Sequence, residues 1–205
     1  MPAAGPVNGL ERLIRSRRMT RSFTSESIGY ELLDALLDVA RRAPSAGFSQ
    51  GVHFLALSGA ATSTFWDVTG SGEWFSADHP GLLNAAAIVL PLADSAAYTT
   101  RYAEQDKLGA GLAEAANWPV PYWLTDAAMA TQQLLLLAEE AGLGALFFGI
   151  FRNEALLLEN LGVPAGITAI GAVALGYRSA DDVPSGSPQT RTRAAASRVI
   201  HHDHW

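Results

Sequence analysis

The fold is decided by residues 126–151, which read DAAMATQQLLLLAEEAGLGALFFGIF. Between 126 and 141, alanine and leucine cover most of a helical circumference, and a helix that is apolar nearly all round must be buried. Gly142 and Gly144 end this helix, because glycine takes the left-handed cap conformation at little cost. The apolar run at 145–151 then predicts a strand or turn. The helix therefore lies either at the centre of the domain or in an interface between two subunits.

The chain on either side of this stretch contains both helices and strands. Apolar spacing predicts a short helix before Arg17 and a longer one at 29–43, which Pro44 ends. Apolar runs predict strands at 52–57, 86–92 and 167–177. Because helices and strands mix without strict alternation, the sequence indicates an α+β fold, built as a single domain over residues 1–205.

Composition narrows the class of protein. With 205 residues and 49% hydrophobic content, the chain can bury the core of one domain. A net charge of -6 without a broad basic face argues against nucleic acid as a partner. The apolar runs are too short to span a membrane, and the N-terminal residues do not have the basic-then-apolar order of a signal peptide. The absence of cysteine excludes disulfides and cysteine-based metal sites, so we expect a cytoplasmic protein.

The middle of the chain leaves two interpretations open. Residues 66–83 are rich in glycine and contain Trp66, Trp74 and Phe75, but their hydrophobic periodicity is weak. This segment is either a mobile flap or an irregular surface segment held by buried aromatic anchors. Further on, the charged residues between 101 and 107 predict a solvated helix face.

Arginines cluster near both ends of this acidic chain. Arg17, Arg18 and Arg21 stand in RRMTRSF, and Arg191 and Arg193 stand in QTRTRAA. Guanidinium groups match the oxygens of a phosphate dianion in paired, charge-assisted hydrogen bonds, so the two ends can close on one phosphate. Arginine clusters alone are more often solvated surface runs, and the sequence between them must decide.

Four segments, in order along the chain, resemble those of the FMN-dependent nitroreductase family. They are RRMTRSF, the loop ARRAPSAGFSQ, the segment GLGALFFGIF and the ending QTRTRAAASRVIHHDHW. The resemblance extends from Leu10 to Trp205. It implies a nitroreductase-like α+β fold, with a mixed but mainly antiparallel sheet flanked by helices, in an obligate homodimer that binds FMN at its interface.

The resemblance also implies which residues bind FMN. The phosphate would be held by Arg17, Arg21, Arg191 and Arg193, with backbone or ribityl contacts from Arg18 and Met19. The partner subunit would bring a loop to the flavin, consisting of Ser45, Ala46, Gly47 and Phe48. The isoalloxazine ring would lie along Phe147, Phe148 and Gly149, with one backbone N–H pointing to flavin N5.

A flavin would explain why no acid–base constellation of side chains is visible. The resemblance implies that hydride passes from NADPH or NADH to flavin N5. In a ping-pong mechanism, it then passes to a nitroaromatic, a quinone or a related flat electrophile. No Gly-x-Gly-x-x-Gly motif for a separate dinucleotide site is present. Two alternatives stay open: a protein that stores FMN with little turnover, and a specialised branch that dehydrogenates a heterocycle, removes a halogen or fragments flavin.

Three positions depart from the family pattern. Met19 replaces a frequent serine, Phe48 replaces an asparagine that faces the pyrimidine edge of the flavin, and Ile150 replaces a frequent second glycine. The change at Phe48 affects the expected redox tuning more than binding. The histidines of the tail, within HHDHW, coincide with the C-terminal segment of the family, and we predict no metal site there.

Overall fold

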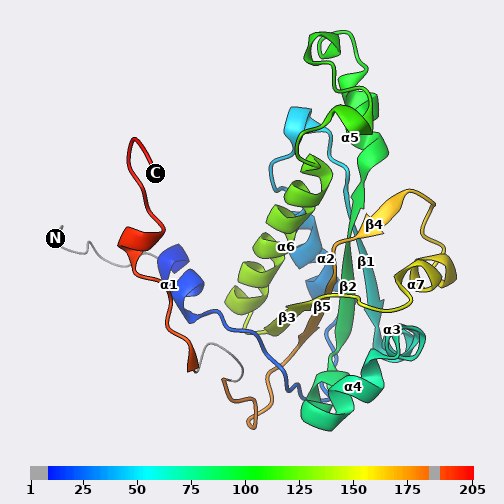
Figure 1. The fold of residues 1–205 in the computed structure, drawn as a ribbon. Helices are drawn as coiled ribbons and strands as arrows, with labels where there is room; N and C mark the ends of the chain where they lie inside the picture. The colour runs from blue at the N-terminus through cyan, green and yellow to red at the C-terminus, as the bar shows by residue number, and fades with distance from the viewer. Residues whose placement is uncertain (1–8, 185–189) are drawn as a thin grey trace.

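A five-stranded antiparallel sheet lies at the centre of the computed structural model, which describes residues 9–184 and 190–205 (Figure 1). The strand order is β1-β2-β5-β3, and β4 also pairs with β2. A parallel bridge joins Met19 to Ala145 of β3, so the sheet is mixed but mainly antiparallel, as predicted. The strands are β1 (Val52–Ser58), β2 (Ala87–Asp94), β3 (Gly144–Phe148), β4 (Ile167–Ala169) and β5 (Ala172–Gly176).

Helices cover both faces of this sheet (Figure 1). The α-helices are α1 (Gly9–Ser16), α2 (Tyr30–Ala40), α3 (Thr62–Thr69), α4 (Ser71–Asp78), α5 (Ser95–Tyr102), α6 (Tyr122–Glu140) and α7 (Glu154–Asn160). Short 3-10 turns include η1 (Ala46–Phe48), η3 (Pro80–Asn84) and η6 (Ala196–Arg198). None of the helices within the described ranges is long and apolar enough to cross a bilayer.

The core is divided by the central strand β2, because successive side chains of a strand point to opposite faces. Val89 packs with the side chains of α2 and α6, including Leu33 and Leu134. Its neighbours Ile88 and Leu90 belong to a second cluster on the other face, together with side chains of α3 and α7. Each cluster therefore packs against one face of the same sheet.

Helix α6 differs from the prediction in two respects. It begins at Tyr122, one turn before the expected Asp126, because Pro121 is accommodated at the position just before the helix. Leu134 and Ala138 are buried, but Ala128 and Met129 are exposed in the single chain. The expected burial on all sides is therefore incomplete within one subunit.

Residues 66–83 are mostly helical, so the expectation of an irregular segment is wrong. Gly70 adopts a left-handed conformation, with φ of 63°, and separates α3 from α4. Trp66 and Phe75 are buried anchors, as expected, whereas Trp74 is exposed. Two short helices joined at a glycine give a periodicity too brief to recognise in the sequence.

The predicted strand at 167–177 is interrupted. Ile170 and Gly171 separate β4 from β5, and Gly171 has φ of 146°, a conformation that favours glycine. A side chain at this glycine would collide with the ring of Phe147 and the carbonyl oxygen of Phe148. The interruption thus allows β5 to pack closely against the end of β3.

Candidate functional site

The basic segment after α1 lies against the edge strand β3. Thr20 donates its backbone N–H to the carbonyl of Ala145 at 2.9 Å, beside the bridge that joins Met19 to the same residue. Further along, Phe23 donates its N–H to the carbonyl of Gly81 at 3.0 Å. The segment therefore passes from β3 to the turn η3, which directly follows α4.

Asp182 fixes the shape of this segment. Its buried carboxylate accepts hydrogen bonds from the backbone N–H groups of Arg21, at 2.8 Å, and Ser22, at 3.0 Å. The guanidinium of Arg18 contacts the same carboxylate and donates to the Asp182 carbonyl at 2.9 Å. The Arg18 side chain is therefore occupied by a protein partner, and only its backbone and that of Met19 remain suited to a ligand.

Arg17 has a different environment. One terminal nitrogen of its guanidinium, Nη1, is buried and has no hydrogen-bond partner within residues 9–184 and 190–205. A buried donor without an acceptor is costly, by about 1–3 kcal/mol. An anion beside Arg17 would remove this cost, so the residue fits the predicted phosphate site.

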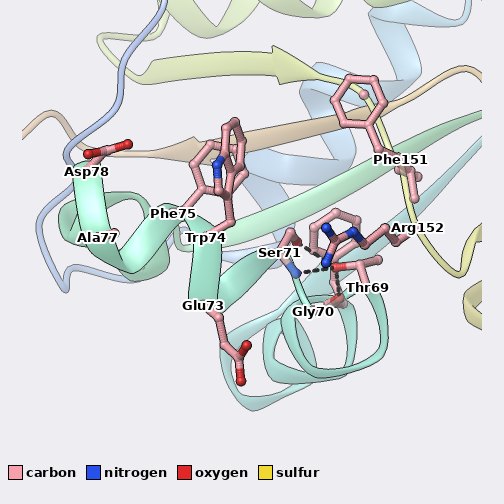
Figure 2. Close-up of a pocket in the computed structure, with 13 residues that line it drawn as sticks. Thr69, Gly70, Ser71, Glu73, Trp74, Phe75, Ala77, Asp78, Phe151 and Arg152 are labelled. Atoms are coloured by element: carbon pink, nitrogen blue, oxygen red, sulfur yellow. Dashed lines mark hydrogen bonds between the residues drawn. The ribbon is translucent and has the colours of Figure 1, made fainter.

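A cavity of about 600 Å³ opens at the far end of β3, between α4 and the residues that follow the strand (Figure 2). Trp74 and Phe151 stand at its opening, with relative exposures of 64% and 88%. Arg152 extends toward Ser71 in Figure 2, whereas the carboxylate of Glu73 points away. This size and this aromatic lining suit a flat ring system.

Of the three residues predicted to lie along the flavin ring, only Gly149 lines this cavity. Phe148 directs its ring into the core, where it stacks on Trp66 with centroids 6.0 Å apart. Phe147 packs with the other core cluster. Gly149 and Ile150 line the cavity itself, and a Cβ at Gly149 would lie 2.7 Å from the ring of Phe151. The ring of Phe151 therefore covers the position that a side chain at residue 149 would take, and only a glycine fits there.

The loop containing Ser45, Ala46, Gly47 and Phe48 lies at the opposite end of the sheet from this cavity (Figure 1). It packs against the start of α6, where the N–H of Ala46 donates to Asp126 at 2.9 Å. Phe48 is 75% exposed and has φ of 58°. One chain thus does not bring this loop to the cavity, which is the arrangement expected if a second subunit supplies it.

Arg191 and Arg193 lie in the C-terminal tail. All residues from 190 to 205 are exposed. Neither arginine forms an ion pair or hydrogen bond with another residue in the part of the chain that the structure describes. The structure does not join the pair to Arg17, so its assignment to the phosphate stays a prediction.

Sequence reasoning missed three features of this region. Asp182 and Asp126 are acidic residues without a motif around them, and Arg152 was not distinguished from other surface charges. Asp182 lies 160 residues or more from the groups it binds, and Asp126 lies 80 residues from Ala46. Only the burial of both carboxylates in the folded chain identifies them.

Comparisons with known proteins agree with this geometry. The model of the nitroreductase family matches residues 14–177. A protein of Archaeoglobus fulgidus named as an NADH dehydrogenase/NAD(P)H nitroreductase is 27% identical over 169 residues, which cover 81% of this chain and 83% of that protein.

Solved structures of similar fold cover almost the whole chain. A Desulfovibrio desulfuricans protein, described as a nitroreductase in complex with FMN, gives a TM-score of 0.70 at 22% identity over 97% of this chain and 98% of its own. CLA-ER, an enone reductase of gut-bacterial fatty acid saturation, gives 0.72 at 21% identity over 97% and 100%. These likenesses show the fold, and the family model, which covers most of the sequence, shows that the chain belongs to the nitroreductase family.

Proposed function

We propose that this protein is an FMN-dependent reductase that oxidises NADPH or NADH and reduces nitroaromatics, quinones or related flat electrophiles by a ping-pong mechanism. The observation that carries the proposal is the path of β3. The strand begins beside the segment that follows Arg17, whose buried Nη1 has no hydrogen-bond partner among the described residues, and it ends at the cavity lined by Gly149. Membership of the nitroreductase family and the FMN complex of the Desulfovibrio protein support the choice of cofactor.

The path suggests how the chain would hold FMN. Arg17 and Arg21, with Arg191 and Arg193 from the tail, would bind the phosphate, because guanidinium groups match its oxygens. The backbone around Gly149 would lie against the ring, and the loop that carries Phe48 would come from a second copy. The protein would therefore work as a homodimer, whose formation would also cover the exposed Met129 side of α6.

FMN, when bound, supplies the exchange of a hydride equivalent between the nicotinamide and the acceptor. The residues of the chain orient and shield. A backbone N–H near Gly149 would polarise the ring, and the aromatic walls formed by Trp74 and Phe151 would exclude water and stack on flat molecules. The proton that the reduced acceptor also takes up would come from solvent at the open side of the cavity, so no ionisable side chain is required to supply it.

The first prediction is that the protein purifies as a yellow homodimer, or binds added FMN, and oxidises NADPH when a quinone is present. Absorbance, light scattering and steady-state kinetics check these three points. A flavin-free monomer that does not bind FMN would refute the proposal. A yellow dimer with negligible NADPH oxidation would instead support an FMN-storing protein, the alternative function.

A second prediction concerns Phe48→Asn. Asparagine tolerates the left-handed φ of 58° better than phenylalanine, so the loop should keep its shape. If position 48 faces the pyrimidine edge, the new amide donates to a carbonyl that gains negative charge on reduction. One such bond, favouring the reduced form by about 1 kcal/mol, raises the two-electron potential by roughly 20 mV. Spectroelectrochemistry measures this shift, and an unchanged potential in a folded, flavin-loaded variant would place Phe48 away from the ring.

A further inference from the structure

The loop at residues 45–50 has an unusual backbone. Gly47, Phe48 and Gln50 all adopt left-handed conformations, with φ of 61°, 58° and 54°. For a residue with a side chain this conformation costs about 1–2 kcal/mol. Strained backbone of this kind persists only where the surrounding structure determines it, and it is concentrated at functional sites. The groups that hold this loop are therefore informative.

Asp126 holds the first half of the loop. Its side chain is 2% exposed, and Oδ2 accepts one hydrogen bond from the N–H of Ala46, at 2.9 Å, and another from the hydroxyl of Tyr98, at 2.7 Å. Burial and the bond to Asp126 raise the pKa of Tyr98, so its hydroxyl stays protonated and remains a donor. The bond from the N–H of Ala46 to this buried carboxyl group fixes where η1 begins.

Arg101 holds the turn itself. Its Nε donates to the carbonyl of Gly47 at 3.0 Å. The two terminal nitrogens are bound to Asp106, each at 2.7 Å, and Nη1 also reaches Glu104 at 3.0 Å. These bonds hold the guanidinium in place. The sequence predicted a solvated helix face here, but Arg101 also binds the loop.

Hydrogen bonds within the loop complete its support. The N–H of Gln50 donates to Oγ of Ser45 at 3.0 Å, and the hydroxyl of Ser49 donates to the carbonyl of Ala46 at 2.6 Å. All of these contacts hold the backbone, while the ring of Phe48 is left 75% exposed. The backbone of the loop is thus held by several hydrogen bonds, whereas the described residues leave most of the Phe48 ring uncovered.

We infer that Asp126 and Arg101 are positioning residues, which hold the Ser45–Phe48 loop in its binding shape so that it can close the flavin site of a second copy. The inference rests on the proposed function, in which this loop approaches the ring from the partner. Holding the loop in advance removes the cost of ordering it when the ligand binds. Asp126 and Arg101 themselves do not touch the ligand.

Binding of FMN and of riboflavin to the intact dimer tests the inference. Asp126→Ala removes the hydrogen bond to the N–H of Ala46. It should weaken the binding of FMN and of riboflavin by the same factor, about tenfold, because the loop is proposed to contact the ring and not the phosphate. Asp126→Asn keeps an acceptor for Ala46 and should restore most of the affinity. Tyr98→Phe is the matched control, since it removes the hydroxyl that donates to the same Oδ2 of Asp126 but leaves the bond to the loop.

Tyr98→Phe is expected to lower the Tm and to keep flavin affinity within about twofold, since it leaves the Asp126–Ala46 bond in place. Equal losses in Asp126→Ala and Tyr98→Phe would reduce the network to a structural role and overturn the inference, as would wild-type affinity in a folded Asp126→Ala dimer. If Asp126→Ala does not fold, Arg101→Gln gives the same test at the carbonyl of Gly47. If the wild-type protein binds no flavin, both the proposed function and this inference are wrong. If the wild type binds flavin and the variants do not behave as expected, only this inference is wrong.

Discussion

Replacing Arg191 and Arg193 together by alanine should weaken FMN binding about a hundredfold or more and leave riboflavin binding nearly unchanged. Only FMN carries the phosphate that these side chains are proposed to meet. A hydrogen bond to a charged group contributes about 1.5–3 kcal/mol, so the loss of two corresponds to at least two powers of ten in affinity. Titration of the apoprotein with each flavin, followed by fluorescence, measures both affinities.

The tail offers a matched control for this pair. Arg198 is equally exposed and lies in η6, five residues after Arg193. Arg198→Ala should change the affinity for either flavin by no more than about twofold, because salt screens the interaction between a distant exposed charge and the ligand. If FMN binds the double variant as tightly as the wild type, the arginine pair does not belong to the phosphate site.

The fold could be predicted from the sequence where hydrophobic periodicity is long and uninterrupted. The helix at 126–141, the strands at 52–57 and 86–92 and the glycine that ends α6 are found within a few residues of their observed bounds. In each of these elements, the spacing of the apolar residues matches one type of secondary structure with its apolar side buried. The mixed, mainly antiparallel sheet implied by the family resemblance is confirmed.

The two short helices between residues 62 and 78 were not predictable in this way. Helices α3 and α4 have eight residues each, and the left-handed Gly70 between them interrupts the period. Asn153 shows a related limit. Asparagine just before a helix favours a side-chain cap, but the side chain of Asn153, which precedes α7, donates to the carbonyl of Val68 at 2.8 Å and does not cap the helix. Tertiary contacts outweigh local preference at such positions.

The candidate site was predictable in its charges but not in its supports. Arg17 and Gly149 are recognisable from short motifs. In the structure, Nη1 of Arg17 is buried without a hydrogen-bond partner among the described residues, and Gly149 lines the cavity. The carboxylates that shape the site, Asp126 and Asp182, stand alone in the sequence. Their role depends on which backbone N–H groups the fold brings to them, and a single sequence does not contain that information.

Asp182→Ala is expected to lower the free energy of unfolding by about 3 kcal/mol or more. The same substitution should also lower the affinity for FMN. The N–H groups of Arg21 and Ser22 each lose a bond to a buried carboxylate, which contributes about 1.5–3 kcal/mol. The contact with Arg18 adds less, because that side chain is partly exposed and water replaces part of the interaction. Urea denaturation, with the apoprotein, measures the loss.

The neighbouring Asp181 separates this effect from a change in local charge. It is exposed and accepts a hydrogen bond from the hydroxyl of Ser22 at 2.7 Å, so Asp181→Ala should cost only about 0.5 kcal/mol. Both variants remove one negative charge near the basic segment, and only Asp182→Ala frees the backbone that carries Arg21. If the two variants lose the same stability, electrostatics of the surface would account for the effect, and Asp182 would not be what holds the segment that carries Arg21 against the fold.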